Sequence, residues 1–122
     1  VAKLNKRFTN RIMMKLAGGR LLAVVHHTGR RSGRAYQTPV IATRLNGGYV
    51  IPLTYGPGSD WSLNVRAAGE FRLEHRGRMH RLVEPRLVGP EEGLQPLPAW
   101  QRPVLRMVGV TSFIKAEEAG AA

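Results

Sequence analysis

Short apolar segments separated by turn-forming residues are the feature that most limits how this chain can fold. Residues 20–28, 36–45 and 49–54 are each rich in apolar, β-branched or aromatic residues, as strands usually are. Asn-Gly-Gly at 46–48 separates two of these segments, and this combination favours a tight β-hairpin. Strands joined by short hairpins pair antiparallel, because a parallel pair needs a long crossover connection. The pattern therefore predicts an antiparallel sheet.

The second half of the chain adds strands and short helices. Residues 70–77 alternate apolar and charged side chains, and residues 78–88 predict a partner strand that bends near Pro85. Two short helices are predicted at 59–69 and 99–108, a loop at 89–98 and a last strand at 109–117. This order predicts a mainly β, α+β fold, a small antiparallel barrel with helices attached. A chain of 122 residues without repeats or a linker is expected to form one domain over 1–122.

The beginning of the chain predicts an amphipathic helix over residues 3–17. Leu4, Phe8, Ile12 and Leu16 recur at every fourth position, and lysines and arginines occupy the other faces. Such a helix can pack its apolar stripe on the barrel or lie on an anionic membrane surface, and we expect the packed arrangement. The sequence has no apolar run long enough for a membrane span and no signal peptide. We therefore predict a cytoplasmic protein, with peripheral membrane contact through this helix as the alternative.

The distribution of charge predicts an anionic partner. The net charge is +11, and the first 59 residues contain ten lysines and arginines but no acidic residue before Asp60. A field of one sign attracts anions and raises their local concentration. Nucleic acid, a membrane and a phosphorylated cofactor all satisfy this requirement. Single-strand nucleic-acid binders interleave basic residues with aromatic platforms, whereas aromatic residues make up only 7% here, so we expect no nucleic-acid partner.

The side chains that usually carry out catalysis by themselves are scarce. The chain has no cysteine, and none of its four histidines has a metal-motif spacing, so we predict no metal site and expect each histidine to be neutral or on the surface. No serine lies in a nucleophile elbow, and no pair of carboxylates is evident. A chain with so few acid–base groups and a strong preference for anions suggests that a cofactor supplies the chemistry.

The stretch "HTGRRSGRAYQTPV", residues 27–40, is the best candidate for an anion site. Gly29 and Gly33 allow positive φ angles, so that successive backbone N–H groups can form an anion-binding concavity. Three arginines add bidentate donors, and Thr28 and Ser32 add hydroxyls. A solvated turn decorated with arginines is the alternative. The loop matches neither a Walker motif nor a dinucleotide-binding motif.

Taken together with a second motif, this stretch resembles the deazaflavin-dependent nitroreductase family of actinobacterial and archaeal proteins. Members share a split β-barrel related to the FMN-binding fold. The family signature combines a T-G-R-K/R-S/T-G turn, a T/N-P dipeptide, and a helix with W-x-x-N and a small-residue ending. The resemblance covers residues 20–90, and the joint spacing is more specific than any single piece. The matching residues are Thr28 to Gly33, Thr38, Pro39, Trp61, Asn64 and Ala67 to Gly69.

The resemblance implies the cofactor F420, an 8-hydroxy-5-deazaflavin with a phosphate and an oligoglutamate tail. That polyanionic tail agrees with the acid-free first half of the chain, and FMN is the cofactor alternative. The tail is expected at the arginine loop and the ring near Thr38 and Pro39. Tyr55 is a candidate proton donor. The residues expected to bind the cofactor are Arg30, Arg31, Ser32, Gly33, Arg34, Thr38, Pro39, Thr54, Tyr55, Gly56, Trp61 and Asn64.

The implied activity is hydride transfer from reduced F420 to a small acceptor, which is a quinone, an activated alkene or a nitro compound. Many members have a lysine where Tyr55 stands, and the nitro-reducing members have tyrosines in their C-terminal part. This chain has no tyrosine after Tyr55, so a quinone or conjugated alkene is the preferred acceptor class. A non-catalytic F420- or lipid-binding protein on the same fold is the alternative, with a nucleic-acid-binding module as a third reading. A homodimer is a further prediction.

Overall fold

The computed structural model describes residue 15 and residues 18–120. The predicted helix over 3–17 therefore lies outside the described residues, apart from Lys15, which is helical. The choice between packing that helix on the barrel and laying it on a membrane stays a prediction. Within the described residues, no helix is long and apolar enough to cross a membrane.

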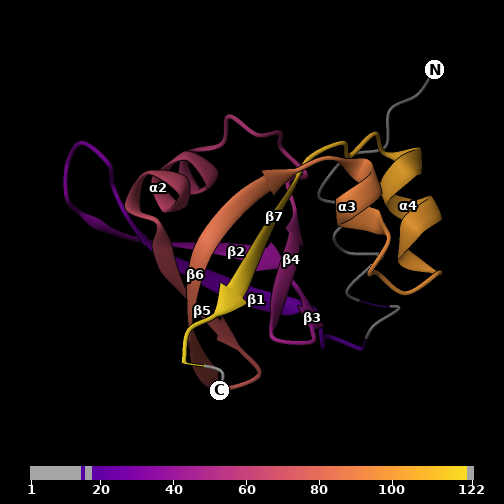
Figure 1. Cartoon of the computed structure of the whole chain (residues 1–122), viewed down its shortest axis with the longest axis horizontal. Helices are drawn as coiled ribbons and strands as arrows, with labels where there is room; N and C mark the ends of the chain where they lie inside the picture. Colours follow the sequence, from indigo (N-terminus) through magenta and orange to yellow (C-terminus); the bar gives the residue numbers. More distant parts are fainter. Residues whose placement is uncertain (1–14, 16–17, 121–122) are drawn as a thin grey trace.

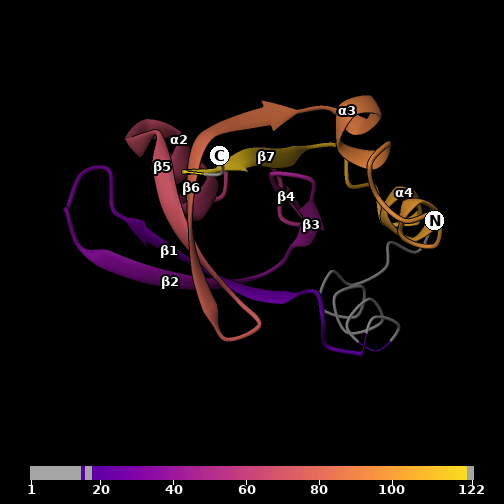
Figure 2. The ribbon, with the colours of Figure 1, turned by 60° about the horizontal axis from the view of Figure 1, so that its bottom comes forward.

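Seven antiparallel strands form one curled sheet (Figures 1 and 2). The antiparallel sheet was predicted with six strands, and the seventh arises because the predicted strand over 36–45 forms two. The spatial order of the strands is β2-β1-β5-β6-β7-β4-β3, and Figure 2 shows the sheet curling around an interior. This is the split-barrel architecture expected from the sequence. The strands are β1 (Leu22–Thr28), β2 (Ala35–Ile41), β3 (Thr43–Leu45), β4 (Gly48–Pro52), β5 (Glu70–His75), β6 (Arg78–Val88) and β7 (Phe113–Glu118).

Two strands are interrupted where the sheet must bend. The predicted strand over 36–45 divides at Ala42, whose N–H bonds the Leu21 carbonyl oxygen at 2.8 Å. In β6 the pairing with β7 shifts register between Val83 and Arg86, and Glu84 in between has a φ of 54°. A bulge of this kind bends the strand and increases its twist. The bend predicted near Pro85 is therefore confirmed.

Within residues 18–120, three helices accompany the sheet: α2 (Asp60–Ala68), α3 (Pro90–Leu94) and α4 (Gln101–Met107). As predicted, α2 follows Ser59 and ends at Gly69, which has a φ of 79°. The prediction of a loop over 89–98 was wrong in part, since α3 begins at Pro90. Proline is favoured in the first helical turn, where its missing N–H would have had no partner. Burial of Leu94 in the second core cluster also stabilises this short helix.

The core has two parts. The larger cluster fills the barrel, and in it Val25 and Leu73 are fully buried. The smaller cluster packs α3 and α4 against one end of the sheet through residues such as Leu94, Leu105 and Phe113. Burial of each large apolar side chain contributes about 1.5–3 kcal/mol. The two clusters hold the β1–β2 loop and α2 at the other end of the molecule, where the candidate site lies (Figure 1).

A buried polar cluster lies inside the barrel at the start of β1. The Tyr49 hydroxyl and His75 Nδ1 are 2.9 Å apart, and His75 Nε2 lies 2.6 Å from the Arg20 carbonyl oxygen. Because a carbonyl only accepts, Nε2 carries the proton and Nδ1 accepts from Tyr49. Arg44 donates to the Tyr49 oxygen at 3.3 Å and pairs with Glu118 at 2.7 Å. Tyr49 and His75 are buried, Arg44 is exposed at the edge of the cluster, and each of these groups has a protein partner.

Candidate functional site

The loop between β1 and β2 is held in shape by its own hydrogen bonds. Gly29 N–H donates to the Arg34 carbonyl at 2.8 Å, and Gly33 N–H donates to the Gly29 carbonyl at 3.0 Å. Gly33 has a φ of 72°, a conformation that disfavours other residues. A side chain at position 29 would collide with Ser32, whose hydroxyl accepts from the Arg34 N–H at 3.2 Å. The glycines and Ser32 therefore shape the turn, and the arginines project from it.

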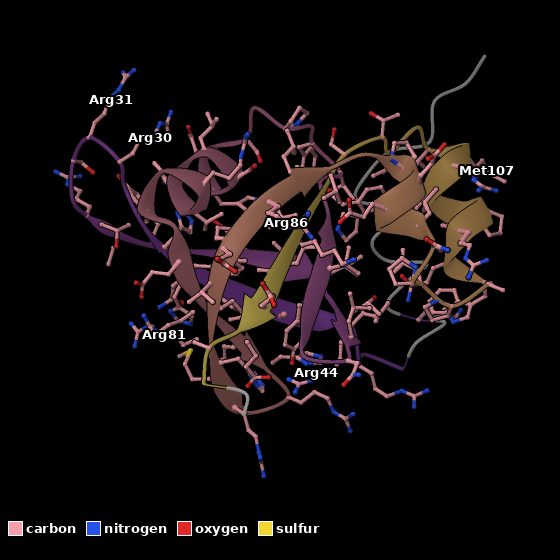
Figure 3. The ribbon with its side chains drawn as sticks, viewed as in Figure 1. Arg30, Arg31, Arg44, Arg81, Arg86 and Met107 are labelled. Atoms are coloured by element: carbon pink, nitrogen blue, oxygen red, sulfur yellow. The ribbon has the colours of Figure 1, made fainter. Side chains whose placement is uncertain are left out.

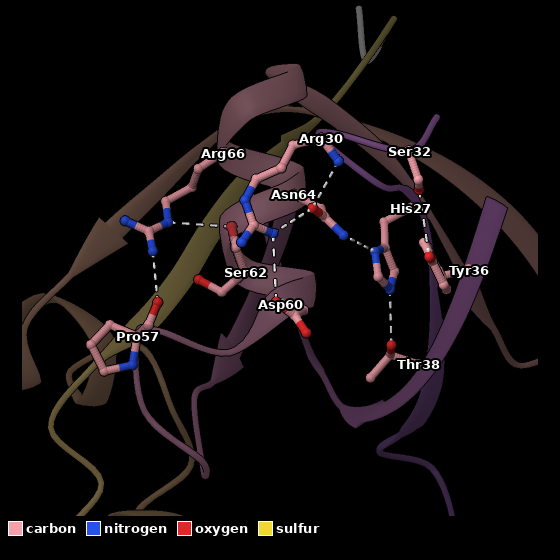
Figure 4. Close-up of polar contacts among 10 residues, drawn as sticks. All are labelled: His27, Arg30, Ser32, Tyr36, Thr38, Pro57, Asp60, Ser62, Asn64 and Arg66. Carbon is pink, nitrogen blue, oxygen red and sulfur yellow. Dashed lines mark hydrogen bonds and ion pairs between the residues drawn. The ribbon is translucent and has the colours of Figure 1, made fainter. Parts of the chain in front are cut away.

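A cavity of about 460 Å³ lies between this loop, β2 and the start of α2. Figure 4 shows the polar side chains that meet there. The β1–β2 hairpin forms one wall and α2 forms the other. The lining residues are His27, Gly29, Arg30, Arg31, Ser32, Tyr36, Gln37, Thr38, Asp60, Trp61 and Asn64.

The charge at this cavity is positive in spite of one carboxylate. Arg30 is held by two contacts, an ion pair with Asp60 at 3.6 Å and a hydrogen bond from NH1 to Asn64 Oδ1 at 2.8 Å. The guanidinium groups of Arg31 and Arg34 make no hydrogen bond or ion pair with residue 15 or residues 18–120. Figure 3 shows Arg31 extending from the loop tip. Unpaired guanidinium groups beside a cavity are suited to a phosphate or carboxylate.

A second, smaller cavity of about 80 Å³ adjoins the first. The two share Thr38 and Trp61, and the smaller one is also lined by Pro39, Thr54 and Tyr55. Ser59 lines it as well, and the Ser59 hydroxyl is buried without a partner among the described residues. Buried hydroxyls nearly always have a hydrogen-bond partner. Ser62 on α2 also has a buried hydroxyl without a partner among the described residues, although it lines neither cavity, so this feature alone does not mark a ligand contact.

Nine of the twelve predicted cofactor-binding residues line one of these two cavities. Gly33, Arg34 and Gly56 do not; Gly33 and Arg34 belong to the loop itself. Sequence reasoning missed His27, Tyr36, Ser59 and Asp60. For His27 a signal existed, because Ala23, Val25 and His27 alternate along β1 and all face the interior.

His27 is 8% exposed, and this burial favours the neutral imidazole. Burial lowers the pKa of His27; the carboxylate of Asp60 opposes this effect and the neighbouring His26 adds to it. Tyr36, directly opposite on β2, stacks on the imidazole with ring centroids 5.7 Å apart. No group of three potential metal ligands occurs among the residues that the structure describes.

The fold and the site together define a class of protein. A split barrel with a cationic loop beside a cavity is suited to hold an anionic organic cofactor. The chain belongs to the F420H(2)-dependent quinone reductase family, whose model matches residues 1–114. It is therefore an F420-dependent oxidoreductase, and the predicted cofactor is confirmed.

Solved structures agree with the fold. An F420-H2 dependent reductase (FDR-A) has a TM-score of 0.55 and 16% sequence identity, over 80% of this chain and 95% of that one. A structure described as a domain-swapped dimer has a TM-score of 0.53 and 18% identity, over 92% of this chain and 96% of that one. At these identities the likeness concerns the fold. No curated protein matches the chain.

Proposed function

We propose that the two adjoining cavities bind F420 and that the chain uses it to reduce a quinone. The observation that carries this proposal is the continuity of the site. Guanidinium groups without a partner among the described residues lie at one end, and Thr38 and Trp61 connect this cavity to a smaller one lined by Thr54 and Tyr55. F420 has a matching order of groups, with an anionic tail at one end and a polar ring at the other.

The tail phosphate and carboxylates belong, in this proposal, at Arg30, Arg31 and Arg34 of the loop. The ring and its ribityl chain belong near a second set of residues on or beside the walls of the smaller cavity, and Trp61 and Asn64 close this side from α2. Gly56 has a φ of 93° and turns the chain next to that wall. The second set is Thr38, Pro39, Thr54, Tyr55 and Gly56.

F420 supplies a hydride when it is bound, and the protein has to orient it, keep water away and provide a proton. Trp61 and Thr54 are 8% and 9% exposed and help to keep this part of the site dry, which strengthens electrostatic contacts there. Tyr55 is 63% exposed at the edge of the smaller cavity. We propose Tyr55 as a proton donor because its hydroxyl can exchange protons with solvent.

The acceptor class follows from the family and from the site. The family is named for quinone reduction, and the site offers neutral hydroxyls from Thr38, Thr54 and Tyr55. Hydroxyls can donate to the two carbonyl oxygens of a quinone. An activated alkene is the second candidate and a nitro compound the third.

We also propose that residues 1–122 act as one domain that forms a homodimer. One sheet connects the described strands, and a structure of similar fold is described as a domain-swapped dimer. Sedimentation equilibrium of the full chain tests this proposal. A monomer at every protein concentration would contradict it.

Steady-state oxidation of reduced F420 by the purified chain tests the function. Three arms with a short-chain naphthoquinone, a conjugated enone and a nitroimidazole compare the acceptor classes. We expect the naphthoquinone to give the highest kcat/KM. Oxidation no faster than in buffer, in all three arms, would contradict the proposed function. Tyr55→Phe, measured beside the wild type, tests the proton donor, since an unchanged kcat would exclude it.

A further inference from the structure

Four side chains form a continuous chain of hydrogen bonds into the site (Figure 4). Asn64 Oδ1 accepts from Arg30 twice, from the backbone N–H at 3.1 Å and from NH1 at 2.8 Å. Asn64 Nδ2 lies 3.0 Å from His27 Nδ1. His27 Nε2 lies 2.9 Å from Thr38 Oγ1. The chain therefore begins at a cation and ends at a hydroxyl that lines both cavities.

The direction of donation in this chain follows from its first member. Arg30 can only donate, so the carbonyl oxygen of Asn64 must face it and the amide N–H group must face His27. His27 Nδ1 then accepts, and Nε2 carries the proton of the neutral ring. Nε2–H donates to Thr38. The Thr38 hydroxyl oxygen is already an acceptor, so its own hydrogen is free to donate to another partner.

The surroundings of His27 support the neutral form. Asp60, Arg30 and His26 are the charged or titratable groups near it, and Tyr36 stacks on its face. Burial is the strongest influence and lowers the pKa of His27. Asn64 itself is 4% exposed, so water competes little for its amide.

We propose that Asn64 and His27 are positioning residues that direct the hydrogen of the Thr38 hydroxyl toward the ligand, so that the site favours a ligand with a carbonyl oxygen at this point. This inference rests on the proposed function of the cavities. The carbonyl oxygen can belong to the deazaflavin ring or to the quinone, and both offer the same acceptor chemistry. A ligand with an N–H group at this point would have to share the Thr38 oxygen with His27 and would leave the hydroxyl hydrogen without an acceptor, so it would bind less well.

The tautomer of His27 in the protein without ligand is the first test, and it does not depend on the function. Nitrogen NMR of the imidazole rings in the full chain reports which nitrogen carries the proton. We expect an unprotonated Nδ1 and a protonated Nε2 at neutral pH. A protonated Nδ1 with a bare Nε2 would overturn the inference even if the chain reduces quinones with F420.

The isosteric Asn64→Asp variant tests the direction of donation. A carboxylate at position 64 still accepts from Arg30 but cannot donate to His27, so Nδ1 must carry a proton. The pKa of His27 rises beside that carboxylate. Below the raised pKa the imidazolium still donates to Thr38. Above it, Nε2 is bare, the Thr38 hydroxyl must donate to it, and the ligand loses its donor.

The readout is kcat/KM for the naphthoquinone, as the ratio of Asn64→Asp to wild type at each pH. We expect this ratio to fall about three- to tenfold as pH rises through the raised pKa of His27 in the variant. A change of this size corresponds to the loss of one neutral hydrogen bond. A merely structural role would give the same ratio at every pH, and that result would overturn the inference. Dividing by the wild type removes any titration of F420 itself.

Thr38→Val and Thr38→Ser complete the test. They show whether the carbonyl oxygen that accepts from Thr38 belongs to the cofactor or to the quinone. Valine removes the hydroxyl, and serine restores it. If Thr38→Val raises the Kd of F420, the oxygen belongs to the cofactor. If it leaves that Kd unchanged and lowers kcat/KM for the quinone, the oxygen belongs to the acceptor. Either result, with recovery in Thr38→Ser, supports the inference. No change in both quantities would overturn it.

Discussion

His27 and His75 lie inside the same barrel, and each forms hydrogen bonds through both ring nitrogens. On β1, His75 is paired with Ala23, four positions before His27, which is about 13 Å along the strand. His75 Nδ1 accepts from Tyr49, and His75 Nε2 donates to a backbone carbonyl. The same tautomer of His27 leads instead to the Thr38 hydroxyl at a cavity. The His75 network ends at a protein carbonyl, which we call the closed network. The His27 network ends at a hydroxyl that a ligand can reach, which we call the open network.

The difference shows that two similar hydrogen-bond networks can have different roles in one barrel. The His75 network ties β4 and β5 to the segment before β1, so its bonds add to the stability of the barrel. The His27 network is set by Arg30 and Asn64 on the loop and α2. The hydroxyl hydrogen of Thr38, its last donor, has no acceptor among the described residues. We infer that the first network stabilises the fold and the second prepares a binding site. The predictions below test that division.

The largest expected effect concerns the loop. Replacing Arg30 and Arg31 together by alanine should weaken F420 binding about tenfold or more, because a hydrogen bond to a charged group contributes about 1.5–3 kcal/mol. A fluorescence titration with F420 measures this. Arg78→Ala combined with Arg106→Ala is the matched control, since it removes the same charge from exposed positions that line neither cavity. Equal losses in both double variants would mean that only net charge matters.

A smaller effect is expected from the closed network. Tyr49→Phe removes one hydroxyl and leaves the buried His75 Nδ1 without a donor, which should lower the free energy of unfolding by about 1–3 kcal/mol. Urea denaturation measures it, and F420 affinity should not change. Thr38→Val at the open network should lower unfolding free energy by less than about 1 kcal/mol, because water can replace the hydroxyl there. If the two variants exchanged these effects, the division between the networks would be wrong.

The smallest effect is a pH dependence of stability. Because the folded pKa of His27 is lowered by burial, the unfolded chain binds this proton more readily. Stability should therefore fall as pH decreases below about 6.5, the unfolded value. Urea denaturation of wild type and His27→Gln at about pH 8 and about pH 5.5 measures the contribution. The variant should lose less stability on acidification than the wild type. An equal loss would show that His27 does not carry the effect.

Much of the fold could be predicted because local signals agreed with it. The hairpin at 46–48, the helix limits at Ser59 and Gly69, and the bend near Pro85 are all local features, and all three agree with the structure. The helix α3 was missed because glycine and proline nearby favour a loop. Its stability comes from burial of Leu94 against the second core cluster, which is a tertiary effect.

The site was predicted less completely, for a related reason. The arginine loop and Trp61 belong to motifs, so the sequence indicates them directly. His27 was expected to be neutral or on the surface; it is buried, and its burial lowers its pKa. Its importance depends on Asn64, which is distant in sequence and reaches it from α2. A single sequence gives no sign of such a contact.

The central claim is that the cofactor binds at the end of the barrel that holds the His27 network, and not around the His75 network. An amide proton–nitrogen correlation spectrum of the full chain, recorded during a titration with F420, tests it directly. We predict shifts for amides of residues 27–38 and 54–64, with almost none for residues 44–50 and 75–80 around the closed network. Shifts centred on Tyr49 and His75, or spread evenly over both ends, would contradict the account.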